Sequence, residues 1–245
     1  MAQRAVNGNH DGQAQEVPSV RVVSFYTPDK YYVDSAKALS QRLARLGVPY
    51  YFKAMPRDDE NWAEVTTRKI SFLQECFASM PEERIVWIDI DSEVYFWPSE
   101  LNSFSADMIG FTRGSGRRTD IGKYSRFWSP VLLGFKRSPA VDSFLARASE
   151  AGAANQDSTI TDDFMWQEAW LSERENLSIH LLGPGLHTSS NPAFSFGSSG
   201  NVNAYKSKAL QHEKPLRGIH SETGVRALLA RAAQVSLLKA RGLLK

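Results

Sequence analysis

Two aspartates, Asp89 and Asp91, stand one residue apart at the end of the apolar run RIVWIDID. An extended strand points every second side chain to the same side, so this spacing predicts two carboxylates that can share one divalent cation. Two acids in an apolar setting also need a counter-charge, because burying like charges without one is costly. Two solvent-exposed acids without a role are the alternative. Their place after an apolar strand favours a ligand site, since open α/β sheets bind ligands at the carboxyl ends of their strands.

Lys69, Asp162 and Asp163 are the next residues whose types suit such a site. Lys69 follows Arg68 in an expected helix, where it either reaches a phosphate as a point charge or belongs to a solvent-exposed helix face. Asp162 and Asp163 open another expected helix, which Thr161 would cap, and negative charge there either complements the helix dipole or acts on a substrate. Both interpretations of each residue stay open from the sequence alone.

The elements that must position these residues alternate between strands and helices. Runs of β-branched and aromatic residues predict strands, and apolar residues at helical spacing predict helices that stop at glycine or proline. An order of strand, helix, strand, helix begins a parallel sheet and places the chain in the α/β class. We expect strands at residues 21–26, 48–53, 84–91, 107–112, 131–135 and 178–182, and helices at 31–46, 66–80, 138–151 and 161–171.

The expected domain organisation is one folded unit between two different end segments. Residues 1–18 are polar and aperiodic, which predicts a disordered tail, and residues 19–222 form the domain. Within this domain we expect one long functional or mobile loop over residues 183–203. Residues 223–245 carry an apolar stripe with five basic side chains and no acid. They predict a basic amphipathic helix that either packs on the domain or lies on an anionic membrane surface.

Composition and charge exclude several classes of protein. Hydrophobic residues make up 42% of the 245 residues and charged residues 23%, far from the composition of a disordered chain. Lysine and arginine number 29 against 27 acidic residues, so we expect no nucleic-acid partner. The lone cysteine, Cys76, excludes an intrachain disulfide and a cysteine-based zinc site. Without a bilayer-length apolar run or an apolar leader, we expect a cytoplasmic protein, with peripheral contact at the inner face of the membrane through residues 223–245 as an option.

Several motifs follow one another in a telling order. Thr27 and Tyr31 follow the first expected strand, Lys69 precedes the acidic strand, and IVWIDIDSEVYFWP contains the D-x-D motif. WSPVLLGFKRSP and TDDFMWQEAW come next, and Gly218-Ile219-His220 with Gly224 stands near the end. Together, over about residues 20–226, these motifs resemble the GT-A nucleotide-sugar glycosyltransferases, most nearly the glycogenin-like retaining branch. Trp-Ser-Pro replaces the family's Asn-Ser-Gly, Asp-Phe replaces its Asp-Gln, and the histidine-to-glycine spacing is one residue longer.

The resemblance implies a fold and a reaction. The fold is a single Rossmann-like domain of GT-A type, with a mixed, mostly parallel central sheet flanked by helices. The reaction is transfer of a hexose from a nucleotide-diphosphate donor, above all a UDP-sugar, with retained configuration. The acceptor would be a hydroxyl of a glycan or lipid-linked glycan, as in polysaccharide biosynthesis, and the cofactor Mn²⁺ or Mg²⁺.

The resemblance also implies which residues bind the donor and the metal. Asp91 and His220 would be direct metal ligands, and Asp89 would reach the cation or the ribose hydroxyls. For His220 a surface histidine is the alternative. Thr27 and Tyr31 would hold the nucleobase, Tyr31 by stacking, and for either residue alone a turn hydroxyl or a half-buried aromatic is the simpler interpretation.

Lys69, Asp162 and Asp163 receive their roles in the same way. Lys69 would reach the donor diphosphate or sugar. Asp162 and Asp163 would be catalytic residues. Asp163 would hydrogen-bond the donor sugar or approach the acceptor hydroxyl, and it would act as a base only if the enzyme inverts configuration.

Two other functions compete with this interpretation. A phosphohydrolase of the haloacid-dehalogenase type would use Asp89 as the nucleophile and Asp91 as the general acid. In that class the motif normally follows the first strand, whereas here two strand–helix units precede it. A non-catalytic nucleotide- or carbohydrate-binding module would keep an aromatic pocket without needing two acids and a histidine.

Overall fold

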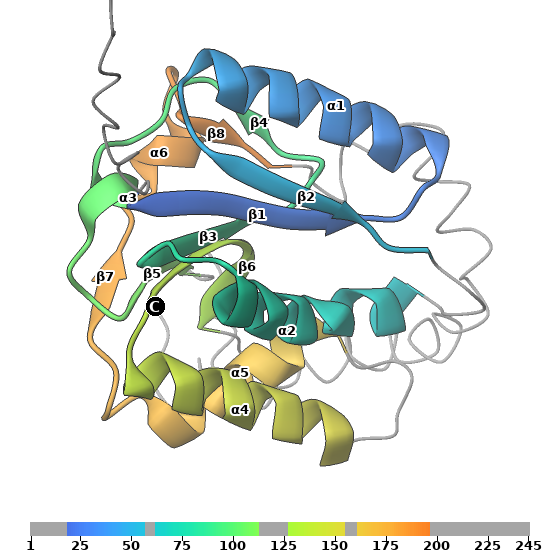
Figure 1. Ribbon diagram of the computed structural model, residues 1–245. Helices are drawn as coiled ribbons and strands as arrows, with labels where there is room; N and C mark the ends of the chain where they lie inside the picture. The colour runs from blue at the N-terminus through green and yellow to red at the C-terminus, as the bar shows by residue number, and fades with distance from the viewer. Residues whose placement is uncertain (1–18, 57–61, 113–126, 155–160, 197–245) are drawn as a thin grey trace, which may run out of the picture.

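The computed structural model describes residues 19–56, 62–112, 127–154 and 161–196. These residues form one six-stranded sheet with helices on both faces and a separate two-stranded sheet (Figure 1). The strands of the large sheet, in chain order, are β1 (Val20–Tyr26), β2 (Tyr50–Ala54), β3 (Arg84–Ile88), β5 (Met108–Thr112), β6 (Trp128–Lys136) and β7 (Ile179–Leu181).

The large sheet is mixed and mostly parallel, with the spatial order β2-β1-β3-β6-β5-β7. β1 pairs in parallel with β2 and β3, and β5 pairs in parallel with β7. β6 runs antiparallel between β3 and β5, so the amino end of β6 lies beside the carboxyl end of β3. The expected fold class, an α/β domain with a mixed, mostly parallel sheet flanked by helices, is confirmed.

The helices lie where apolar spacing and end signals place them. Their bounds are α1 (Lys30–Arg45), α2 (Trp62–Ser79), α3 (Glu100–Ser103), α4 (Pro139–Ala154), α5 (Asp162–Glu173) and α6 (Gly185–Thr188). The Asp29 side chain accepts a hydrogen bond from the Tyr32 backbone and caps α1. Gly47 follows α1 at a φ of 68°, the left-handed conformation that glycine adopts at low cost. Thr161 occupies the cap position of α5, but its side chain makes no capping hydrogen bond.

Several expected boundaries are wrong, and the one at β3 bears on the site. The strand ends at Ile88, three residues earlier than expected, and residues 89–92 form a turn in which the Ser92 N–H donates to the Asp89 carbonyl at 3.0 Å. The two aspartates therefore lie in a turn rather than on an extended strand, and strand alternation does not set their relative directions. β6 begins at Trp128, three residues before the expected start, because this segment pairs with the end of β5.

The segment expected as a long loop over residues 183–203 contains structure. Its described part, up to Phe196, holds α6 and β8 (Phe194–Ser195). β8 pairs antiparallel with β4 (Glu93–Val94), which directly follows the two aspartates. Phe194 and Ala193 are fully buried, so hydrophobic burial fixes this segment although its glycines and serines suggest a loop.

A hydrophobic core covers each face of the large sheet. One core joins β-strand side chains to α2, α4 and α5, and the other joins them to α1 and α3 (Figure 1). Gly134 on β6 marks how closely the second core packs, because a Cβ atom there would lie 2.5 Å from Ile109 Cγ2. Asp89 and Trp87 point towards the first core, on the side of α2 and α5.

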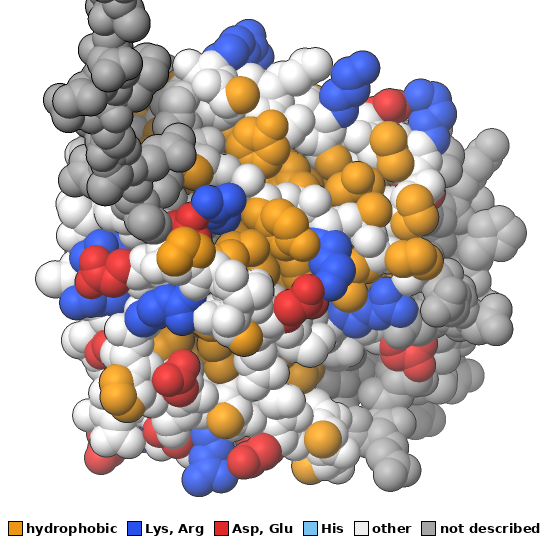
Figure 2. All heavy atoms as spheres, viewed as in Figure 1, with side chains coloured by type: hydrophobic (Ala, Val, Ile, Leu, Met, Phe, Trp, Pro, Cys, Tyr) orange, Lys and Arg blue, Asp and Glu red, His pale blue; other side chains and the backbone are white. Residues whose placement is uncertain are grey.

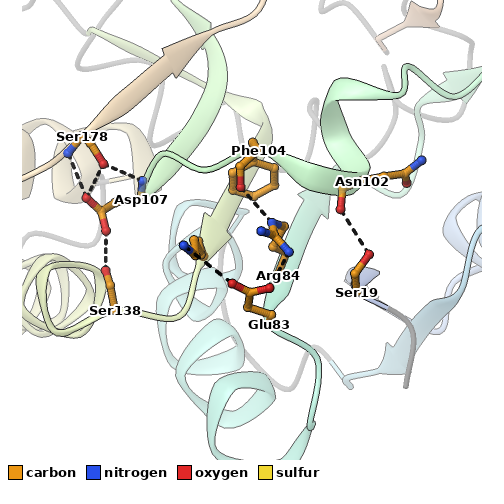
Figure 3. A network of polar contacts seen from close by, with 9 residues as sticks. Ser19, Glu83, Arg84, Asn102, Phe104, Asp107, Ser138 and Ser178 are labelled. Carbon is orange, nitrogen blue, oxygen red and sulfur yellow. Dashed lines mark hydrogen bonds and ion pairs between the residues drawn. The ribbon is translucent and has the colours of Figure 1, made fainter. Parts of the chain in front are cut away.

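A polar network joins the sheet to its connections at the end opposite the two aspartates (Figure 3). The Asp107 carboxylate accepts hydrogen bonds from the hydroxyls of Ser138 and Ser178 and from the Ser178 N–H. It thereby joins the segments that precede β5, α4 and β7. Arg84 donates to the Phe104 carbonyl and pairs with Glu83 beside it.

Candidate functional site

Asp89 lies directly after β3. This strand lies near the middle of the sheet, between β1 and β6. Its backbone N–H donates to the Val131 carbonyl of β6 at 2.9 Å. Its Oδ1 accepts two hydrogen bonds, from Trp87 Nε1 at 2.9 Å and from Lys69 Nζ at 3.1 Å. Backbone and side chain are therefore both fixed by the protein before any ligand binds.

Lys69 is the buried cation of the site, with 5% of its surface exposed. Its Nζ lies 2.6 Å from Asp162 Oδ2, 2.9 Å from the Pro130 carbonyl and 3.1 Å from Asp89 Oδ1. The ammonium also lies 4.7 Å from the centre of the Trp87 ring, in a cation–π contact. The interpretation of Lys69 as part of a solvent-exposed helix face is wrong.

Charge balance explains how Lys69 stays ionised in the interior. Burial by itself would lower the pKa of the Lys69 ammonium, but the negative charges of Asp162 and Asp89 and their hydrogen bonds hold the pKa above its usual value. The counter-charge that paired acids need is therefore supplied in part by the protein. Lys69 joins α2 to the β3 end and to the start of α5 through these two carboxylates.

Asp162 and Asp163 open α5, but their surroundings differ. Asp162 is buried against Lys69, and its backbone N–H donates to Thr66 Oγ1 of α2 at 3.3 Å. Asp163 is half-buried. Interaction with the helix dipole therefore does not account for Asp162 by itself, because its carboxylate belongs to the ion-pair network around Lys69.

Thr27 and Tyr31 lie at the end of β1 and the start of α1. Thr27 is buried, and its hydroxyl donates to Asp29 Oδ2 at 2.6 Å. The Tyr31 hydroxyl donates to Asp91 Oδ2 at 3.3 Å, so the tyrosine contacts the second aspartate of the turn. The Tyr31 ring packs edge-on against Tyr32 at 4.9 Å between ring centres.

Electrostatics at this corner reflect the nearby acids. Burial raises the pKa of the Tyr32 hydroxyl, and the charges of Asp91 and Asp29 raise it further, so this phenol stays neutral. Asp91 itself is half-buried at the surface of the turn. The structure thus brings Asp89, Asp91 and Tyr31 together with Lys69 and Asp162 at the carboxyl ends of β1 and β3.

The donor set fits a cation that prefers oxygen. Asp89 and Asp91 supply carboxylates, the ligands that suit Mn²⁺ and Mg²⁺, and Mg²⁺ commonly takes one or two carboxylates and completes its shell with substrate phosphates. Within the described ranges no group of three or more histidine, cysteine, aspartate or glutamate side chains gathers as a complete metal cage. His220, the expected third ligand, lies outside the described residues, as do residues 1–18 and 223–245.

Three contacts around the candidate site were not expected from the sequence. Trp87 holds Asp89 and covers Lys69, Asp29 orients Thr27 while it caps α1, and Thr66 supports Asp162. The spacing of Trp87 two residues before Asp89 could have indicated the first contact, because residues two apart in an extended run are expected on one side, although Asp89 lies just past the end of β3. Asp29 was recognisable as a helix cap, but no sequence signal pairs Thr66 with a distant helix.

Comparisons with known proteins agree with the fold. No protein-family model and no curated protein matches the chain. Among solved structures, the chain is similar to a glycosyltransferase involved in the glycosylation of the major capsid of PBCV-1, with a TM-score of 0.52 and 12% sequence identity. The match covers 80% of this chain and 99% of that chain. At this identity the likeness establishes a shared fold.

None of the helices in the described residues is both long and apolar enough to cross a membrane.

Proposed function

We propose that this chain is a metal-dependent glycosyltransferase of the GT-A type, with Asp89-Ile90-Asp91 as its D-x-D motif. The observation that carries the proposal is the turn at the carboxyl end of β3, where Asp89 is held by Lys69 and Trp87 and Asp91 contacts Tyr31. Open α/β sheets bind ligands at the carboxyl ends of their strands. The shared fold with a glycosyltransferase supports the same function.

The donor in this proposal is a nucleotide-diphosphate sugar, above all a UDP-sugar. Thr27 and Tyr31 lie at the turn between β1 and α1, next to Asp91, and are the residues proposed to hold the nucleobase. The Thr27 hydroxyl hydrogen is already donated to Asp29, so Thr27 offers the base an acceptor rather than a donor. A divalent cation, Mn²⁺ or Mg²⁺, would supply charge stabilisation for the departing diphosphate.

Each charged residue has a separate task in the proposed reaction. Asp89 and Asp91, together with His220, are proposed to hold the cation, and hydrogen bonds from Lys69 and Trp87 fix the Asp89 carboxylate in place. Lys69 is saturated by protein acceptors, so we assign it the role of a positioning residue that also adds positive charge behind the diphosphate site. The network therefore prepares the carboxylates before the donor arrives, which lowers the cost of reorganising them.

The acceptor side is assigned to α5. Asp162, fixed against Lys69, positions the start of this helix. Asp163 is proposed to hydrogen-bond the donor sugar or the acceptor hydroxyl. We propose transfer of a hexose to a hydroxyl of a glycan or lipid-linked glycan with retained configuration, as in the glycogenin-like branch, in the synthesis of a polysaccharide.

The experiment is a screen of UDP- and GDP-sugars for Mn²⁺-dependent hydrolysis without an acceptor, with titration of UDP in the presence and absence of Mn²⁺. We expect cation-dependent binding of UDP and slow release of sugar from one donor. A generic aryl phosphate tests the phosphohydrolase alternative on the same preparation. Hydrolysis of the aryl phosphate without any UDP binding would overturn the proposal, and UDP binding without turnover of any sugar donor would favour a non-catalytic module.

A further inference from the structure

Strand β2 forms one edge of the large sheet and, among the described residues, pairs only with β1. The Val22 N–H of β1 donates to the Pro49 carbonyl at 2.9 Å, and the Met55 N–H donates to the Tyr26 carbonyl at 2.8 Å. The backbone polar groups of a strand alternate between its two edges. These two hydrogen bonds therefore show which backbone N–H and C=O groups between Pro49 and Met55 point towards β1 and which point away from it.

This alternation leaves three residues with backbone groups at the open edge. Tyr51 and Lys53 share the parity of Pro49 and face β1, and the pairing register runs through β2 without interruption. The N–H and C=O groups of Tyr50, Phe52 and Ala54 consequently point away from β1. Among the described residues, no strand pairs with β2 on this side.

The side chains at this edge are aromatic and exposed. Tyr50 is 38% exposed and Tyr51 is 37% exposed. Figure 2 shows hydrophobic side chains gathered on the face across which β2 runs in Figure 1, with charged groups among and around them. The Tyr50 ring packs on Phe52, and the Tyr51 ring stacks over Phe72 of α2.

Two of the usual devices that keep an edge strand from pairing, a proline and a bulge, are absent between Tyr50 and Ala54. A third device is a charged side chain, above all a lysine. The one charged residue of β2 is Lys53, and both carboxylate oxygens of Glu75 hold its ammonium, at 2.6 and 2.7 Å.

We propose that β2 pairs antiparallel with β2 of a second copy of this chain and joins the two large sheets into one. A two-fold axis at Phe52 matches the open residues to one another, Phe52 with Phe52 and Tyr50 with Ala54. It also places Lys53 across from Tyr51 rather than from a second lysine. Within the paired strands no like charges are opposite one another, and each Lys53 lies across from a Tyr51 ring. The open edge of β2 is therefore complementary to itself.

The size of the contact sets the expected strength of the dimer. Pairing of two five-residue strands buries less than the roughly 800 Å² per partner of a typical stable complex. The dimer should therefore form in a concentration-dependent way and dissociate on dilution. This self-association is independent of the proposed activity, because the open edge of β2 carries none of the residues assigned to the donor or the cation.

Sedimentation equilibrium of the full chain over a concentration series tests the proposal. Ala54→Pro removes one N–H from the open edge without removing a hydrogen bond to β1, and it should weaken association by about tenfold or more. Val33→Ser, which removes an exposed apolar side chain from α1, is the matched control and should leave association unchanged. Melting curves followed by circular dichroism establish that each variant folds.

A pair of charge variants separates self-pairing from other contacts. Tyr51→Lys would place a second cation across from Lys53 of the other copy and weaken the dimer, whereas Tyr51→Glu would place an acid there and preserve it. If Ala54→Pro fails to fold, this pair decides the matter. A wild-type chain that stays monomeric at about 1 mM would overturn the proposal. So would a dimer that tolerates Tyr51→Lys as well as Tyr51→Glu.

Discussion

The ammonium of Lys69 lies between the buried carboxylate of Asp162 and the half-buried carboxylate of Asp89, and the three groups form a charged trio. Removing the cation leaves both acids without their counter-charge, and Asp162 is buried in a low-dielectric setting, where an unpaired charge is far more costly than at the surface. The indole of Trp87 adds a neutral hydrogen bond to Asp89 and covers the ammonium. The trio therefore stabilises the fold and orients the site at the same time.

Lys69→Met should destabilise the protein by about 3–5 kcal/mol, because it leaves the buried carboxylate of Asp162 and the half-buried carboxylate of Asp89 without their cation. Asp162→Asn in the same background should recover part of that loss, since it removes one of the stranded charges. Urea denaturation measures both. Lys53→Met, at the exposed pair with Glu75, is the control and should scarcely move the midpoint. A Lys69→Met variant as stable as the control would contradict the charge assignment.

Asp91→Asn should leave folding largely intact and abolish the Mn²⁺-dependent part of UDP affinity, because the substitution removes a ligand charge. Calorimetric titration of UDP with and without Mn²⁺ measures the effect. Glu93→Gln removes an exposed acid two residues along the chain and serves as the control for net charge. Unchanged Mn²⁺-dependent affinity in Asp91→Asn would remove Asp91 from the metal site.

His220→Ala should weaken cation-dependent activity less than Asp91→Asn, because it removes a neutral ligand rather than a charged one. Donor hydrolysis across a Mn²⁺ series gives the comparison, with the cation concentration for half-maximal activity as the readout. If the variant matches the wild-type chain across the series, the third ligand must be another residue.

At the level of elements, six segments meet at the site. The ends of β1 and β3, the starts of α1 and α5, and one turn of α2 each contribute a side chain, and the amino end of β6 supplies the carbonyls of Pro130 and Val131. The amino end of β6 lies beside the carboxyl end of β3 because the two strands are antiparallel. At the opposite ends of the strands, hydrogen bonds to Asp107 join the segments that precede β5, α4 and β7. These hydrogen bonds have no part in the proposed chemistry.

Asp107→Asn tests this structural role through pH. Partial burial alone would raise the pKa of the Asp107 carboxyl, but hydrogen bonds from Ser138 and Ser178 hold the pKa below its usual 3.8. The carboxylate therefore stabilises the fold above pH 3.8, and this contribution is lost as the pH falls through the lowered value. At neutral pH the variant should lose about 1 kcal/mol, since an amide cannot accept all three hydrogen bonds and the site is partly solvated.

Denaturation of Asp107→Asn and the wild-type chain over a pH series measures the difference. The two midpoints should converge under acid conditions, where the wild-type carboxyl is protonated. A difference that stays constant across the series would show that Asp107 acts through shape rather than charge.

At the scale of the whole molecule, residues 223–245 are the segment whose sequence suggests a location. Its five basic side chains and apolar stripe should gain on the order of 1 kcal/mol per charge at an anionic leaflet. A truncation after Glu222 should remain folded and active but should no longer sediment with anionic vesicles. Neutral vesicles and a salt series are the controls, because electrostatic binding weakens steeply with ionic strength. If the full chain ignores anionic vesicles, or the truncation unfolds, the segment is structural.

The sequence by itself determined the class of fold, the order of its main elements and the place of the acidic pair. Periodicity and glycine or proline stops are local properties, so α1 and the end of α2 were predictable within a residue. The apolar run before Asp89 indicated a strand inside the sheet for the same reason. These features depend on neighbours in the chain, which a linear reading contains.

Tertiary structure decided what surrounds the acids. Burial of Lys69 between Asp89 and Asp162 depends on α2, β3 and α5 packing together, and no periodicity encodes which lysine of a helix meets two distant carboxylates. The turn at residues 89–92 and the pairing of β8 with β4 likewise arise because hydrophobic burial of Phe194 and pairing with β6 outweigh local preference. Long-range packing energy exceeds local propensity, so these contacts emerge only when the sheet assembles.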